Sequence, residues 1–113
     1  MHEMSLCEGV LQILESEAEK QGFSKVKKVF LEIGDLSSVE PEAMLFCFDV
    51  VTRNSLAEDA DLIIVNVPGT AWCMQCSKTV IVKQRFDECP DCGGYQLQVT
   101  GGEEMKIKEL EVV

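Results

Sequence analysis

The chain has 113 residues, a length typical of one domain or of one domain with a small addition. Its 20 acidic and 10 basic side chains give a formal net charge of −10. This acidity argues against binding to a nucleic-acid backbone, because that binding depends on cations that displace counterions. Hydrophobic residues make up 46% of the chain and charged residues 27%, proportions that exclude a wholly disordered protein.

The N-terminal segment resembles neither an export signal nor a membrane anchor. Its first 22 residues contain five glutamates and lack both a basic start and a continuous apolar core. No apolar run approaches the ~20 residues that a membrane span requires. We therefore expect a cytoplasmic protein without a membrane partner. In such a reducing compartment, its six cysteines are more often metal ligands, catalytic thiols or core residues than disulfides.

Two helices are predicted in the first half of the chain. From Glu3 to Gln21, apolar residues recur at spacings of three and four, and Gly22 follows as a typical left-handed helix end. A second helix is predicted from about Pro41 to Thr52, since proline suits the first helical position. The residues expected on the core faces are Met4, Cys7, Leu11, Leu14 and Ala18 in the first helix, flanked on the same side by Leu6, Val10 and Ile13, and Met44, Leu45, Phe48 and Val51 in the second.

Three strands complete the main fold that the sequence predicts. Lys25–Ile33 alternates in hydrophobicity and is broken by Gly34, whereas Leu62–Val67 is closed by a Pro-Gly pair. Met105–Val112 is a last strand whose alternation changes phase once, as at a β-bulge. We therefore predict an α+β fold in which two helices accompany a three-stranded sheet. This domain comprises residues 1–70 and is completed by residues 101–113, after a hinge at Gly101-Gly102.

Residues 71–100 contain two C-x-x-C knuckles, at Cys73/Cys76 and at Cys89/Cys92, separated by twelve residues. Each knuckle supplies two thiolates from one tight turn, and two knuckles complete a tetrahedral site without an open position. The segment is therefore predicted to be an inserted all-β, zinc-ribbon-like domain with a structural Zn(II). We expect Thr79–Val82 and the residues before Phe86 to form its hairpin, and Trp72, Phe86 and Tyr95 are candidates for its small core.

Other interpretations of the cysteines remain open at this point. The second knuckle resembles that of rubredoxins, which leaves an iron electron-transfer protein as an alternative. A zinc-ribbon module that binds partner proteins is another. Cys7 and Cys47 lie among apolar neighbours, and we expect them to be small buried hydrophobic residues. Because the one histidine, His2, sits at the chain end without the context of a catalytic triad, a Cys–His enzyme is disfavoured.

The only histidine is His2, at the second position of the chain. Its imidazole, its own backbone nitrogen and the α-amine of Met1 are adjacent donors that can form a chelate. Nitrogen donors in a planar array suit Ni(II) or Cu(II) better than zinc or magnesium. The residues alone therefore make a nickel or copper site one option, beside the reading of an ordinary polar N-terminus.

Several segments resemble the HypA/HybF family of hydrogenase maturation nickel chaperones. They are Met1–Cys7, Val29–Leu36 continuing to Ser38-Val39-Glu40, Phe46–Val51, the double C-x-x-C and Glu109–Val112. The resemblance covers essentially the whole chain. It implies an N-terminal nickel-binding domain with an inserted zinc domain. It also implies a non-enzymatic protein that, with a partner GTPase, delivers nickel to the large-subunit precursor of nickel–iron hydrogenase. Urease accessory proteins are further partners to consider, and a monomer or a weak homodimer is expected.

The resemblance also implies the site residues. It assigns Ni(II), the transient cargo, to the Met1 amine, to His2 and to the backbone at Glu3, and it offers Glu40 as a further contact. It assigns zinc to the four knuckle cysteines. Where some relatives follow each knuckle with a histidine, this chain has Ser77 and Gly93. An exchange of thiolate for imidazole at the zinc is therefore not expected here.

Overall fold

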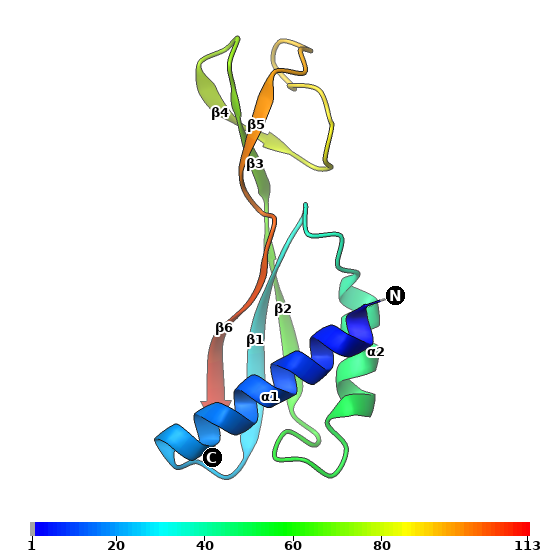
Figure 1. Ribbon diagram of the computed structural model, residues 1–113, viewed down its shortest axis with the longest axis vertical. Helices are drawn as coiled ribbons and strands as arrows, with labels where there is room; N and C mark the ends of the chain where they lie inside the picture. The colour runs from blue at the N-terminus through cyan, green and yellow to red at the C-terminus, as the bar shows by residue number, and fades with distance from the viewer. Residues whose placement is uncertain (1) are drawn as a thin grey trace. The chain divides into compact units, whose positions relative to one another are not determined.

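The computed structural model describes residues 2–113 (Figure 1). Its helices and strands follow in the order α1 (Glu3–Gln21), β1 (Val26–Gly34), α2 (Pro41–Val51), β2 (Asp61–Val67), β3 (Gly69–Cys73), β4 (Lys78–Val82), β5 (Leu97–Gly101) and β6 (Met105–Val112). These strands form two three-stranded sheets, with the orders β2-β1-β6 and β4-β3-β5. The predicted α+β class is confirmed, as is the sheet that combines the first two predicted strands with the last one.

The chain divides into two compact units. The helical unit holds the chain up to Leu31, together with Val39–Val65 and Ile107–Val113. The cysteine unit holds Glu32–Ser38 and Asn66–Lys106. The domain boundaries that we predicted near residues 70 and 100 remain a prediction.

Helix α1 follows the predicted span, and its buried face agrees with the predicted face only in part, at Cys7, Val10 and Leu14. Gly22 ends the helix at φ 79°, and its N–H donates to the Ala18 carbonyl. The buried residues are Glu3, Cys7, Val10 and Leu14. Met4 is 38% exposed and Leu11 is only half-buried, so placing these two in the core was wrong. The reason is Glu3, whose carboxylate accepts a backbone hydrogen bond from Glu40 and so occupies the core side of the first turn.

Helix α2 begins at Pro41, as predicted, and packs against α1. It buries Met44, Cys47 and Phe48, whereas Leu45 is 43% exposed, contrary to our prediction. Leu45 points away because the buried face is centred on the turn from Met44 to Phe48. The Cys7 thiol lies in this interface and donates to the Met44 carbonyl at 3.5 Å. Both helix cysteines are buried, as we expected.

Strand β1 supplies most of the core on the sheet side of the helical unit. Val26, Val29 and Leu31 are fully buried, and α1 crosses the sheet in Figure 1. In β6, half-buried residues alternate up to Ile107 and resume at Leu110. The predicted change of phase in this strand is therefore present.

The second sheet corrects our prediction for the cysteine segment. Strand β3 pairs antiparallel with β4, with Gly69 opposite Val82 and Cys73 opposite Lys78. On its other side β3 pairs with β5, a strand that we did not predict. The hairpin is therefore formed by β3 and β4, with the first knuckle as its turn. Our prediction that Thr79–Val82 pairs with the residues before Phe86 was wrong. The reason is that the tight turn of the knuckle already places β4 beside β3, with Cys73 opposite Lys78.

The core of the cysteine unit is aliphatic. It comprises Leu36, Ala71, Cys73, Val80, Val82 and Cys89. The aromatic core that we predicted is not formed, because Trp72, Phe86 and Tyr95 are 41%, 93% and 72% exposed. In β3, the buried residues Ala71 and Cys73 alternate with Trp72, so strand periodicity turns the tryptophan toward the opposite face.

Candidate metal centres

The two knuckles have the same local geometry. In the first, the Ser77 N–H donates to the Cys73 carbonyl at 2.8 Å, and in the second the Gly93 N–H donates to the Cys89 carbonyl at 2.8 Å. The donor residue has a positive φ in both, 53° at Ser77 and 73° at Gly93. Each turn therefore comprises five residues, 73–77 and 89–93, and holds its two cysteines close together.

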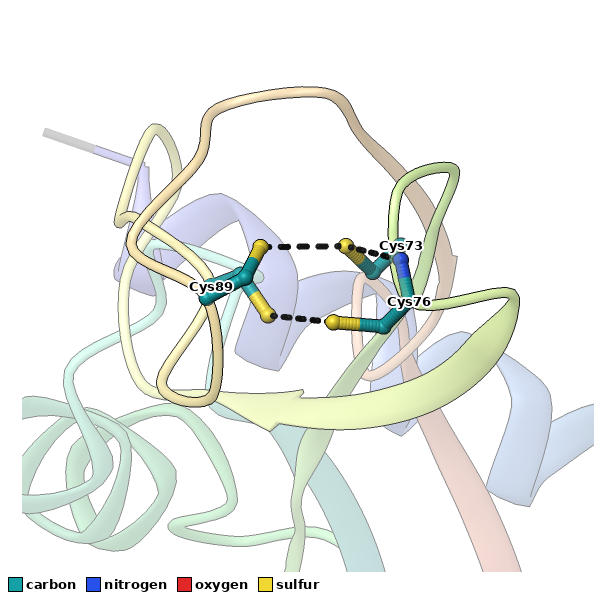
Figure 2. Close-up of side chains that lie close together, drawn as sticks. Cys73, Cys76 and Cys89 are labelled. Atoms are coloured by element: carbon teal, nitrogen blue, oxygen red, sulfur yellow. Dashed lines mark hydrogen bonds between the residues drawn. The ribbon is translucent and has the colours of Figure 1, made fainter.

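The four thiols of the knuckles meet at one point. Their Sγ atoms all lie within 4.8 Å of one another. Cys73 Sγ and Cys92 Sγ are 3.7 Å apart, and Cys76 Sγ and Cys89 Sγ are 3.9 Å apart. Figure 2 shows Cys73 and Cys76 facing Cys89 across this cluster. In a zinc tetrahedron, Zn–S bonds of about 2.3 Å place the sulfurs about 3.8 Å apart, so these residues fit Zn(II).

Electrostatics within the cluster also favour a cation. The Cys76 N–H donates to Cys73 Sγ at 3.4 Å and, as the largest influence, lowers the pKa of Cys73 to about 7. Sulfur contacts with Cys92 and then Cys73 raise the pKa of Cys76 to about 12. Thiols this close cannot all ionise by themselves, because each negative sulfur disfavours the next. A divalent cation among them removes this conflict by stabilising all four thiolates.

Two supporting contacts around the cluster were not predicted. The Gln75 side-chain oxygen accepts a hydrogen bond from the Cys92 thiol at 3.3 Å, which links the interior of one knuckle to the other. Once Cys92 is a thiolate, the Gln75 amide N–H₂ is the group that can donate to this sulfur. An ion pair between Lys78 and Asp91 also joins the two knuckles. Neither contact has a signal in the sequence, since the residues lie 13 or more positions apart and polar residues are common in such turns.

The other predicted site residues lie at the start of the helices in the helical unit. His2 precedes α1, its side chain is exposed, and its carbonyl accepts the hydrogen bond from the Leu6 N–H at 2.9 Å. Glu3 is buried, and its carboxylate accepts a hydrogen bond from the Glu40 N–H at 3.4 Å. The structure thus brings Glu3 and Glu40 together beside His2. Met1 lies outside the described residues.

The carboxyl group of Glu3 is held in its charged form. Hydrogen bonding from its own backbone N–H is the largest influence and lowers the pKa, and the Glu40 N–H adds to this against the opposing effect of burial. The start of a helix favours a negative side chain for the same reason, because its first N–H groups lack partners within the helix. A fixed negative charge therefore lies next to the only imidazole of the chain.

Comparison with known proteins decides the family. The model of the family described as "Hydrogenase/urease nickel incorporation, metallochaperone, hypA" matches residues 1–112. The chain belongs to the HypA family. Hydrogenase maturation factors HypA from Rhodopseudomonas palustris (strain BisA53) and Albidiferax ferrireducens are 64% and 65% identical to it over 112 residues, which is 99% of each chain.

A solved structure in the same family has the same fold. The solution structure of the Ni metallochaperone HypA from Helicobacter pylori superposes with a TM-score of 0.72 at 27% identity, over 100% of this chain and 98% of that one. The family resemblance is thus confirmed, and with it the function of a nickel metallochaperone in hydrogenase maturation. Nothing in these comparisons favours the rubredoxin-like or interaction-module alternatives. Among residues 2–113, no helix is long and apolar enough to span a membrane.

Proposed function

We propose that this HypA-family metallochaperone binds its Ni(II) cargo at the N-terminus, through the Met1 amine, the His2 imidazole and backbone nitrogen at Glu3, with Glu40 as a further ligand. Zn(II) is held by the four knuckle cysteines and stabilises the cysteine unit. The protein acts in the cytoplasm without catalytic turnover. Its partners are the maturation GTPase, the hydrogenase large-subunit precursor and, for urease, accessory proteins.

The observation that carries the nickel assignment is the exposed His2 beside the buried, charged Glu3. His2 is the only histidine, so the chain offers no second imidazole. Glu3 is the first residue of α1, and the first N–H groups of a helix have no partner within it. Nickel can therefore take a backbone nitrogen there without breaking a helical hydrogen bond, in exchange for the bond from the Glu3 N–H to its own carboxylate. The Glu3 carboxylate offsets the repulsion between the positive helix end and a cation.

Exposure at the chain end also suits a cargo that must leave. A closed cage of four protein ligands retains its metal, whereas a chelate at an exposed terminus allows a partner to replace ligands one at a time. The four-thiol cluster has the opposite character, because three of its four cysteines are buried or half-buried and no position stays open. This contrast supports a transient site at the N-terminus and a resident zinc at the knuckles.

A test of the nickel site compares His2→Ala with Ser16→Ala, an exposed control on the same helix. Calorimetric titration of untagged, zinc-loaded protein should show stoichiometric Ni(II) binding for the wild type and for the control, and none for His2→Ala. Glu40→Gln should weaken binding without abolishing it. Residues added before Met1 should also weaken binding, because they remove the α-amine.

Metal analysis of the same samples tests the zinc assignment. All variants should keep about one zinc per chain, because none of the substitutions touches the knuckles. Tight nickel binding by both His2→Ala and the extended chain would place the cargo elsewhere. A red protein containing iron would contradict the zinc assignment.

A further inference from the structure

Helix α1 carries a second stripe of residues beside its core stripe. The core stripe is Glu3, Cys7, Val10 and Leu14, and the second stripe is Met4, Glu8, Leu11 and Glu15, displaced by one residue. Both stripes repeat at spacings of four, three and four, the pattern that lets a helix pack along a neighbour. The first stripe packs inside this chain. The second lines a groove on the surface of the helical unit.

The groove lies between α1 and the last turn of α2. The two helices pack against each other and cross in Figure 1. Its volume is about 590 Å³. The apolar lining consists of Met4, Leu11, Val50 and Val51. Phe46 precedes Val50 by four residues, so it lies on the same face of α2 and extends this apolar surface, and it is 70% exposed. Exposed apolar side chains that gather beside a groove on a folded unit are the feature from which we argue an interaction site.

The charge on the groove defines its partner. Its polar lining consists of Glu8, Gln12 and Glu15, and no cationic side chain lines it. Among the described residues, the ion pairs of the chain include neither Glu8 nor Glu15. Two carboxylates outside these ion pairs, beside the apolar side chains of the same groove, complement a segment that combines apolar and basic side chains.

The shape of the groove favours a helical segment. Met4 and Glu15 are eleven residues apart along α1, a distance of about 16 Å at 1.5 Å per residue. That length accommodates a partner helix of about three turns. Ridges on two neighbouring helices form the kind of groove into which the side chains of a third helix pack.

We propose that this groove binds an amphipathic helix of about three turns, with an apolar stripe flanked by Lys and Arg, belonging to a protein partner of nickel transfer. The role of the partner rests on the proposed function, because Met4 at one end of the groove is two residues from His2. A helix seated there brings its protein within reach of the nickel ligands. The acidic groove then favours encounter with a basic partner over other proteins.

The test uses the full-length, zinc-loaded, ¹⁵N-labelled chain and a synthetic 14-residue peptide of leucine and lysine in helical spacing. On addition of the peptide, the largest changes in amide chemical shift should occur within Met4–Glu15 and Phe46–Val51. Glu8→Gln with Glu15→Gln should weaken binding about five- to tenfold, because two exposed charge pairs are removed. The matched pair Glu58→Gln with Asp61→Asn, two exposed acids away from the groove, should change it less than about twofold.

A second matched pair tests the apolar surface. Phe46→Ala should weaken peptide binding by about tenfold, whereas Phe86→Ala, which truncates the 93% exposed phenylalanine of the cysteine unit, should leave it unchanged. If a groove variant and its matched control weakened peptide binding equally, in either pair, the proposal would be overturned. Equal binding of a peptide with glutamate in place of lysine would also overturn it.

Two further measurements separate the remaining outcomes. A dimer in sedimentation that dissociates in the Phe46→Ala variant would assign the groove to a second copy of this chain and overturn the helical-partner proposal. Nickel titration of the groove variants should match the wild type. If the wild type binds the peptide but not nickel, the proposed nickel site is wrong and the groove proposal is supported. If it binds nickel but not the peptide, the groove proposal is wrong and the nickel site is supported.

Discussion

Cys7 and Cys73 show how position decides the chemistry of one residue type in this chain. Both are buried, yet burial, with a smaller contribution from nearby Cys47, raises the pKa of Cys7 to about 11. At Cys73 the N–H of Cys76 lowers the pKa to about 7. Cys7 is therefore a neutral packing residue in the helix interface, and Cys73 is a ready thiolate ligand. A hydrogen-bond donor within the tight knuckle turn makes the difference.

The raised pKa of Cys7 predicts a loss of stability at alkaline pH. A raised thiol pKa favours the neutral form in the folded state, so its contribution is complete below about pH 8.5, the ordinary thiol pKa. That contribution falls as the pH rises toward about 11. In urea unfolding followed by helical circular dichroism, Cys7→Ala should lose less free energy of unfolding than the wild type over this range. If the free energy of unfolding fell equally with pH in the two proteins, the prediction would be contradicted.

At the scale of elements, the end of β1 depends on a close backbone contact. A Cβ on Gly34 would lie 2.1 Å from the Gly102 carbonyl oxygen. The backbone there is held by hydrogen bonds from Gly34 N–H to the Glu104 carbonyl and from Leu36 N–H to the Gly102 carbonyl. Gly102 itself, at φ 81°, is packed against Pro68 and Gly69. Gly34 thus ends β1, as predicted, and Gly34 and Gly102 are also packing positions; the hinge at Gly101-Gly102 remains a prediction.

Gly34→Ala should therefore destabilise the protein by about 2–3 kcal/mol, because a side chain must displace hydrogen-bonded backbone. The control is Gly9→Ala. Gly9 lies inside α1, where an added methyl group would meet no other element within 4 Å, so alanine there should stabilise by about 0.5–1 kcal/mol. Chemical denaturation of both variants measures the two effects. A neutral Gly34→Ala variant would show that this backbone contact can relax.

At the scale of the whole molecule, the two units depend on different sources of stability. The helical unit has a packed interior of helix and strand residues, including Leu14, Leu31 and Met44, all fully buried. The core of the cysteine unit has six residues, and two of them, Cys73 and Cys89, are proposed metal ligands. A core this small stabilises little by itself, whereas structural zinc contributes about 10–16 kcal/mol in finger peptides.

Removal of zinc by a strong chelator should therefore unfold the segment of β3–β5 while leaving the helical unit folded. NMR spectra should lose the dispersed amide signals of Gly69–Gly101, and helical circular dichroism should persist. Restoring zinc should restore the signals. Retention of these signals in the metal-free chain would mean that packing alone holds the second sheet.

The helices and the first sheet were predictable because their determinants are local. Apolar periodicity, Gly22 after α1 and Pro41 at the start of α2 act within a few residues. The predictions for Met4, for Leu11 and for a hairpin between Thr79–Val82 and the residues before Phe86 were wrong because distant groups decide them. Glu3 takes the core side through a bond to Glu40, 37 residues away, and β4 pairs with β3 rather than with the residues that follow it.

The sequence by itself determined the family, the elements of the helical unit and the four cysteines that meet in one cluster, because motif spacing and hydrophobic period are properties of the chain. Only the tertiary structure decided which stripe of α1 faces the core and which lines the surface groove. It also brought Glu3 next to Glu40 and exposed the aromatic residues of the cysteine unit. These outcomes depend on contacts between segments far apart in the chain, which compete for the same buried space.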